Sequence, residues 1–167
     1  MRKFKILILL LLFATFTVHG QKERFEAIYI YNFTKKIEWP KQVNTGDFII
    51  GILGSSKIIP ELKKVAKAKK VGSRSIIVKE FSGVSEIENC HILYIAPGES
   101  NKLANAKDKL GNSNTLFITD KKGMAKSGSA INFIEKNGKL KFELNKRNAT
   151  EQGLKISADL EKLAIML

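Results

Sequence analysis

Three residues of this sequence, Cys90, His91 and Asp120, carry side chains that often do chemistry inside proteins. Cys90 and His91 are adjacent at the start of a predicted strand, and neighbouring strand residues point to opposite faces of a sheet. The pair is therefore unable to share a metal ion or to act as a nucleophile and its base. The chain also has no CxxC, HExxH or acidic calcium-loop motif. We expect no catalytic residue, no metal site and no cofactor, and hence a protein that is not an enzyme.

Cys90 is the only cysteine, which excludes an internal disulfide. It directly precedes residues 91–95, which are mainly apolar, and this position favours a buried and unreactive thiol. Pairing with a second subunit, or reaction of the free thiol, is the alternative that the sequence leaves open.

Asp120 directly follows residues 115–119, a run that predicts a buried strand. Ligands of open parallel sheets bind beyond the carboxyl ends of the strands. One interpretation is therefore a small-ligand pocket at these strand ends, formed by Gly54, Ser55, Ser56, Pro97, Asp120 and Lys121. The other interpretation is structural, because Asp commonly closes turns and Ser commonly caps helices. Residues 51–57 also lack the glycine spacing of dinucleotide-binding and P-loop motifs.

The elements that position these residues alternate between strands and helices. Short apolar runs predict four buried strands, at 48–53, 75–78, 91–95 and 115–119. Helical spacing predicts helices at 57–69 and from residue 100 or 101 to 110, with a glycine stop at Gly111. This alternation is typical of a parallel α/β sheet.

The C-terminal part follows a different pattern. Alternating runs at 131–134 and 140–144 flank Asn137-Gly138, which predicts a hairpin whose second arm lies near a sheet edge. Ser157 is the expected cap of a last helix that buries Leu160, Leu163 and Ala164. We therefore predict a single α/β domain with a mixed sheet of about six strands, four mainly parallel plus a C-terminal antiparallel hairpin, flanked by helices.

Residues 23–37 predict a helix that is apolar on more than one face and ends before Trp39-Pro40. Such a helix is usually covered on two sides, either within its own fold or by another molecule. The sequence leaves both interpretations open. If another molecule covers it, we expect partner or homodimer contacts at Tyr29, Ile30, Tyr31 and Trp39.

The first 20 residues have the layout of a secretory signal peptide. Arg2, Lys3 and Lys5 precede an apolar run at 6–13, which is too short to span a bilayer. We expect cleavage after Gly20, which leaves residues 21–167 as the mature domain. The signal holds three positive residues and no acidic ones, so the net charge of +13 becomes +10 in the mature chain. This charge indicates either an anionic partner or envelope surface, or a solvated basic surface, and no nucleic acid.

Three blocks resemble the YfiR family of exported regulators: AIYIYNFTKKIEWP at 27–40, CHILYIA at 90–96, and residues 115–145 followed by GLKISADLEKLA at 153–164. The order and spacing of the blocks are specific, and together they span nearly the whole predicted mature chain. The residues that carry the resemblance are Tyr31, Asn32, Phe33, Trp39, Pro40, Asp120, Phe133, Phe142, Asn145, Gly153, Leu154, Ser157 and Leu163.

The resemblance implies a periplasmic α/β protein, often a homodimer, that regulates a membrane signalling protein. In one branch of the family, the protein restrains a diguanylate cyclase by binding its periplasmic sensor domain, and other members are linked to sensor kinases. That branch also uses disulfides in a redox response, whereas only Cys90 matches a family cysteine position in this chain. A periplasmic small-ligand binding protein is the alternative function.

Overall fold

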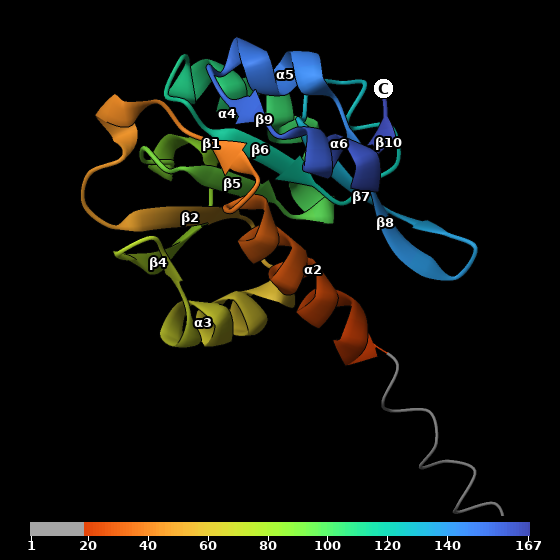
Figure 1. The fold of residues 1–167 in the computed structure, drawn as a ribbon. Coiled ribbons are helices and arrows are strands. Elements are labelled where there is room, and N and C mark those ends of the chain that lie inside the picture. Colours follow the sequence, from red (N-terminus) through yellow and green to blue (C-terminus); the bar gives the residue numbers. More distant parts are fainter. Residues whose placement is uncertain (1–18) are drawn as a thin grey trace, which may run out of the picture.

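The computed structural model describes residues 19–167. The predicted signal peptide and its cleavage lie outside the described residues, apart from the backbone of the last two signal positions. In the described part, the strands form an eight-stranded mixed sheet with the order β10-β8-β7-β6-β5-β2-β4-β3 (Figure 1). These strands are β2 (Phe48–Leu53), β3 (Lys70–Val71), β4 (Arg74–Phe81), β5 (Ile92–Ile95), β6 (Leu116–Thr119), β7 (Ile131–Lys136), β8 (Lys139–Leu144) and β10 (Ile165–Met166).

The remaining elements lie around this sheet. Two short strands, β1 (Ile37–Glu38) and β9 (Lys155–Ile156), pair with each other in a separate antiparallel ribbon. The α-helices of the described part are α2 (His19–Phe33), α3 (Ile58–Ala68), α4 (Leu103–Leu110), α5 (Lys146–Glu151) and α6 (Ala158–Leu163). Short 3-10 turns occur at Lys41–Val43, Val84–Glu86 and Pro97–Lys102.

The centre of the sheet is parallel, as predicted. β2 lies between β4 and β5 and is parallel to both. The strands that follow β2 in the sequence are thus added first on one side of it and then on the other, so the strand order reverses at β2. β6 and β7 continue the parallel arrangement, and β8 returns antiparallel to β7. The α/β class and the mixed sheet are thereby confirmed. The strand number exceeds the predicted six because β3 and β10 have only two residues each, too few to leave a pattern in the sequence.

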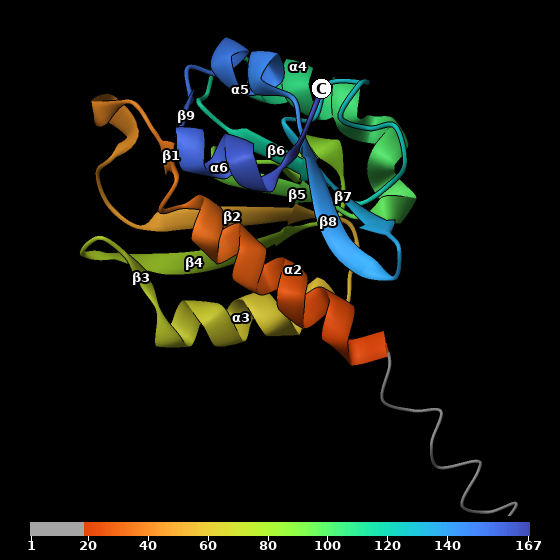
Figure 2. The same cartoon turned by 45° about the vertical axis from the view of Figure 1, so that its right-hand side comes forward.

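The core has one layer on each face of the sheet. On one face, α2, α3 and α6 contribute side chains such as Phe33, Leu62 and Leu160 to a cluster that also contains Tyr94 of β5. On the other face, α4 packs onto the sheet through residues such as Leu103. Figure 2 shows α2 and α3 together on one side of the sheet and α4 on the other. The right-handed connections of a parallel sheet produce this arrangement when the strand order reverses.

The hairpin prediction is confirmed in detail. Asn137 and Gly138 both have positive φ angles, +54° and +66°, as the tight turn between two twisted strands requires. β8 has only the two-residue β10 beyond it, which places it near the sheet edge. Ser157 accepts a hydrogen bond from the Leu160 N–H at 3.3 Å and caps α6, also as predicted.

Three predictions about elements are wrong. The first helix ends at Phe33 rather than near residue 37, because Ile37 pairs with Ile156 in the β1–β9 ribbon. β4 is not covered on both faces: α3 packs on the face that carries the buried Ile76, and Ile77 on the opposite face is 39% exposed. Leu163 is 60% exposed instead of buried, because α6 is less than two turns long and only its Leu160 is fully buried in the core.

Candidate functional site

Helix α2 is fixed to the sheet by aromatic packing. Phe33 contacts Phe142 edge to face with 5.0 Å between ring centroids, and Tyr29 lies 5.7 Å from the same ring. Phe133 of β7 completes the group, at 6.0 Å from Phe33. Large aromatic side chains bury much apolar area, and their edge-to-face contacts add to that effect. The helix is therefore a fixed part of the fold, and its outward face has a defined position.

The four predicted contact residues of this region have different surroundings. Ile30 and Trp39 are buried in the core, and the Trp39 indole donates a hydrogen bond to the His91 carbonyl at 3.2 Å. Tyr29 and Tyr31 are half-buried. Buried side chains are not available to a second molecule, so Ile30 and Trp39 cannot make the predicted partner or homodimer contacts directly. Such contacts at Tyr29 and Tyr31 remain a prediction.

A cluster of charged residues ties α2 to the carboxyl end of β6. The Lys22 ammonium of α2 donates to the Asp120 carboxylate at 2.6 Å. Its distance to the Glu26 carboxylate is 3.4 Å, which makes an ion pair without a hydrogen bond. Glu26 is buried with 1% of its surface exposed, and its Oε1 atom has no hydrogen-bond partner in the structure.

Burial dominates the electrostatics of this cluster. It raises the pKa of Glu26 to about 8, and the neighbouring charge of Asp120 adds to this rise while Lys22 opposes it. Burial also raises the pKa of Asp120, against the effect of its hydrogen bond with Lys22. Tyr94, at the end of β5, has a raised pKa because it is buried and because both carboxylates lie nearby. Two carboxyls beside one ammonium thus favour a state in which the pair keeps one proton.

Sequence reasoning identified Asp120 and missed Lys22 and Glu26. The available signal was helical spacing: Glu26 lies four residues before Ile30 and seven before Phe33, on the stripe that the helix buries. An acidic residue on such a stripe requires a partner. Lys22 is four residues earlier on the same side, and the contact with Asp120 depends on the tertiary fold.

The predicted ligand pocket falls at the carboxyl ends of β2, β5 and β6, where the structure gives several of its residues other partners. A Cβ atom added at Gly54 would collide with the Glu99 side chain, so Glu99 covers this glycine closely. The Ser56 hydroxyl accepts a hydrogen bond from the Ile58 N–H at 3.3 Å, at the start of α3. Ser55 and Pro97 are exposed. Binding of a ligand at these residues stays a prediction.

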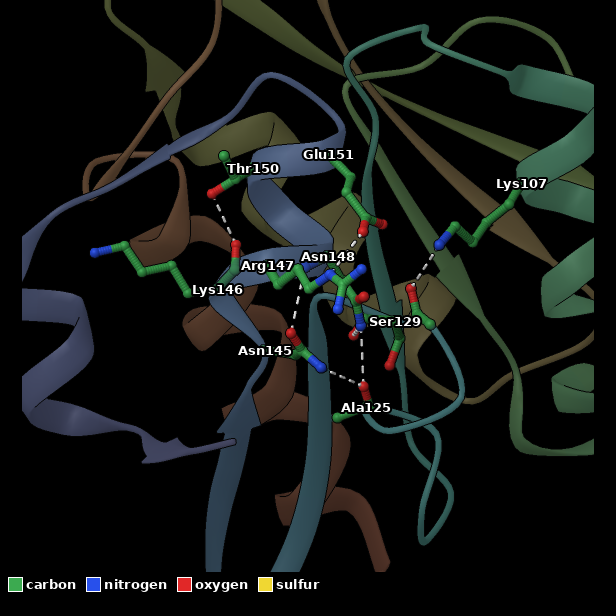
Figure 3. Close-up of polar contacts among 10 residues, drawn as sticks. Lys107, Ala125, Ser129, Asn145, Lys146, Arg147, Asn148, Thr150 and Glu151 are labelled. Carbon is green, nitrogen blue, oxygen red and sulfur yellow. Dashed lines mark hydrogen bonds and ion pairs between the residues drawn. The ribbon is translucent and has the colours of Figure 1, made fainter.

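The loop that follows Asp120 is closed by asparagines. Asn145 and Asn148 both donate to the Ala125 carbonyl at 3.0 Å, and Asn148 also donates to the Ser129 carbonyl at 2.9 Å (Figure 3). The Asn132 side chain accepts from the Lys121 N–H at 3.2 Å. These amides satisfy backbone groups that the irregular loop would otherwise leave without partners. Asn145 is one of the residues that carry the family resemblance, and in this structure it holds the loop.

Cys90 and His91 lie on opposite faces of the sheet, as expected. Burial raises the pKa of the Cys90 thiol to about 12, which fits the prediction of an unreactive thiol. The His91 ring stacks on Phe48 with 4.5 Å between centroids, and its Nδ1 atom accepts from the Ile49 N–H at 3.0 Å. Burial lowers its pKa. No group of three or more His, Cys, Asp or Glu side chains suited to a metal occurs among residues 19–167.

Two hollows flank the outward face of α2. The first, of about 490 Å³, lies between α2 and the β7–β8 hairpin and is lined by Gln21, Lys22, Phe25, Tyr29, Glu135, Gly138, Lys139 and Leu140. The second, of about 530 Å³, lies between α2 and α3 and is lined by Arg24, Ala27, Ile28, Glu61, Lys64, Val65, Ala68 and Lys69. Phe25 and Ile28, which project toward the first and the second hollow, are 51% and 40% exposed.

Comparisons with known proteins give one strong similarity. Residues 23–165 match the sequence model of a protein family described as YfiR/HmsC-like. No curated protein matches the chain. A solved structure described as the ABC domain in complex with L-Trp from Streptococcus pneumonia is similar, with 14% sequence identity and a TM-score of 0.48. The similarity covers 71% of this chain and 54% of the other chain, so it spans about half of the length of that protein. In residues 19–167, the helices are all too short or too polar to cross a membrane.

Proposed function

Because the chain belongs to the YfiR/HmsC-like family, we propose that it is a non-enzymatic regulator that binds the extracytoplasmic sensor region of a membrane signalling protein. The family match carries this proposal, since it spans 143 residues, from 23 to 165. It includes the sheet except Met166 of β10, and every helix that packs on the sheet except the first turn of α2. The partner is a diguanylate cyclase or a sensor kinase, whose output changes on binding. The protein acts in the periplasm after cleavage behind Gly20, as a homodimer.

The outward face of α2 supports this function. A regulator needs a surface that another protein can cover, and α2 presents Phe25 and Ile28 to solvent in its second and third turns. The two side chains lie three residues apart on the helix, so they form one exposed apolar surface that a partner could cover. The aromatic packing of Tyr29 and Phe33 holds this face in place before a partner arrives, which reduces the ordering cost of binding.

The test is to cross-link the protein in intact cells and to identify the captured membrane proteins. We expect capture of one signalling protein through its extracytoplasmic region. Deletion of the gene for this regulator is expected to change the output of that partner, measured as cyclic di-GMP level or kinase phosphorylation. Recovery of no membrane signalling protein would contradict the proposal.

A second function, binding of a small ligand, is favoured by the hollow between α2 and the hairpin. Its volume of about 490 Å³ and its lining of Phe25, Tyr29 and Leu140 beside two lysines match the usual size and chemistry of small-molecule sites. A metabolite that survives purification, detected by native mass spectrometry, would support it. A Leu140→Trp variant that fills the hollow is expected to lose the metabolite, and unchanged retention would count against this site.

A further inference from the structure

We propose that the hollow between α2 and α3 receives an acidic amphipathic helix of the partner protein. This inference rests on the proposed function and specifies the surface and the chemistry of its contact. The floor of the hollow is apolar and its rim is basic, and the two features together select the occupant. The surface is called the α2–α3 groove below and is defined by Arg24, Ala27, Ile28, Glu61, Lys64, Val65, Ala68 and Lys69.

The floor of the groove is built for an apolar side chain. Ala27 and Ala68 are small, so the backbones of the two helices leave a recess between them. Ile28 borders this recess and is 40% exposed, while Val65 is partly buried against the core. A hollow between two packed helices accepts side chains spaced three or four residues apart on a third helix.

The rim of the groove carries an excess of positive charge. Arg24 and Lys69 lie on it, and the charge of Glu61 is compensated by Lys64, whose ammonium is 2.7 Å from that carboxylate. Lys35, in the turn that follows α2, adds a further positive charge, and its ammonium lies 4.5 Å from the ring centre of Tyr31. Complementary charge at a rim steers the partner and fixes its orientation, so the matching helix bears Asp or Glu beside its apolar residues.

Two other occupants fit this groove less well. A second copy bound symmetrically would set this net positive surface against an identical one, and repulsion between surfaces of like charge opposes association. An anionic bilayer would satisfy the lysines, but a flat surface leaves the recessed floor between Ala27 and Ala68 unfilled. An acidic helix satisfies both the charge and the shape.

The inference is tested by placing a photo-crosslinking amino acid at position 28 in cells, with position 163 in α6 and position 77 in β4 as comparison sites. Both comparison sites are exposed and lie outside the groove. We expect position 28 to cross-link to an acidic helical segment in the extracytoplasmic region of a membrane protein, identified by mass spectrometry of the linked peptide. An Arg24→Glu/Lys69→Glu variant is expected to reduce this product about tenfold or more, a change of one decade in affinity.

The matched control is a Lys109→Glu/Lys126→Glu variant, which changes the net charge equally at exposed residues of α4 and of the loop after Asp120. This control variant is expected to leave the cross-linked product unchanged, and a loss as large as in the groove variant would overturn the inference.

Cross-linking of a membrane protein only from position 163 or 77 would also overturn the inference and leave the proposed function standing. A second copy of the chain or a lipid at position 28 would overturn the inference as well. Failure at all three positions would overturn the inference, and the cross-linking of the whole protein described above would then decide the proposed function separately. Circular dichroism of each purified variant establishes that it is folded.

Discussion

Glu26 combines complete burial with a carboxyl group that lacks a full set of partners. Its nearest cation, Lys22, is shared with Asp120, to which the ammonium is closer. In a site of low polarity, two carboxylates and one ammonium leave an uncompensated negative charge, and uptake of a proton removes it. The pKa of Glu26 is about 8 because burial and the charge of Asp120 raise it more than Lys22 lowers it. The folded protein therefore binds a proton here that the unfolded chain has already lost at neutral pH.

The first prediction concerns the stability that depends on this proton. A carboxyl with a raised pKa in the folded state contributes its full stability below its unfolded pKa of 4.5 and loses it as the pH rises through about 8. A Glu26→Gln variant has no such dependence. We expect its free energy of unfolding, relative to that of the wild type, to increase by about 2 kcal/mol between pH 6 and pH 9.

Urea denaturation followed by the fluorescence of Trp39, the only tryptophan, measures this difference. The comparison must be a difference between the two proteins, because His91 has a lowered pKa and increases stability as the pH rises through 6.5. A Glu80→Gln variant, which neutralises an exposed carboxylate, is the control and is expected to follow the wild type. Parallel pH profiles for the Glu26→Gln variant and the wild type would show that Glu26 is ionised in the fold.

The second prediction concerns Cys90. Its thiol is buried with 5% of its surface exposed, and its pKa is raised to about 12, so both access and thiolate formation are suppressed. We expect an aromatic disulfide reagent at pH 8 to label the folded protein at least about 100-fold more slowly than the protein in urea. Equal rates in the two conditions would mean that the thiol is accessible and would reopen pairing with a second subunit.

At the scale of the elements, side chains of α5 and of its cap residue hold the loop after β6 in place by hydrogen bonds. Its cap residue Asn145 and its own Asn148 reach across to the carbonyl groups of Ala125 and Ser129 (Figure 3). The loop itself exposes Lys121, Lys122 and Lys126. Its own backbone hydrogen bonds are local turns, and the two asparagines join these turns to α5. The position of Asp120 and of its contact with Lys22 therefore depends partly on a helix that lies about 25 residues later in the chain.

The third prediction follows from this arrangement. An Asn148→Ala variant loses two hydrogen bonds and leaves the Ser129 carbonyl without its donor, which is expected to cost about 1 to 2 kcal/mol in the free energy of unfolding. The loosened loop is expected to be cleaved several-fold faster by trypsin after Lys126. Arg147→Ala is the matched change in the same helix, where an exposed ion pair with Glu151 contributes about 0.5 kcal/mol or less. Equal cleavage rates after Lys126 in the two variants would show that the asparagine does not hold the loop.

The elements that sequence reasoning predicted well are those with a strong local signal. Residues of β2, β5 and β6 are apolar on both faces, and Asn137-Gly138 has the backbone freedom that a tight turn needs. The elements it missed or misplaced depend on distant partners. α2 ends earlier than predicted because Ile37 pairs with Ile156 in the β1–β9 ribbon. β10 forms because residues 165 and 166 pair with β8. The Lys22–Asp120 contact spans 98 positions and leaves no local pattern.

At the scale of the whole molecule, the position of α2 relates the fold to the predicted export. Helix α2 begins at His19, and among the residues whose side chains the structure describes, from 21 onward, Lys22 is the first with an ion pair to the end of a sheet strand. Cleavage after Gly20 would keep Lys22, Glu26 and all of the aromatic contacts of the helix in the mature chain. The predicted cleavage after Gly20 would therefore remove none of the described contacts between α2 and the sheet.

The fourth prediction is that the protein isolated from the periplasm begins at Gln21. The apolar run at 6–13, preceded by Arg2, Lys3 and Lys5, has the features that direct a chain to export, and the small residue Gly20 fits a cleavage position. Intact-mass measurement of the periplasmic fraction is expected to give a chain of residues 21–167, together with the loss of ammonia when the new terminal glutamine cyclises. A Leu10→Arg variant places a charge inside the apolar run and is expected to keep the full-length chain in the cytoplasm. An unprocessed wild-type chain in the membrane fraction would contradict this prediction and would instead indicate that residues 1–20 act as an anchor.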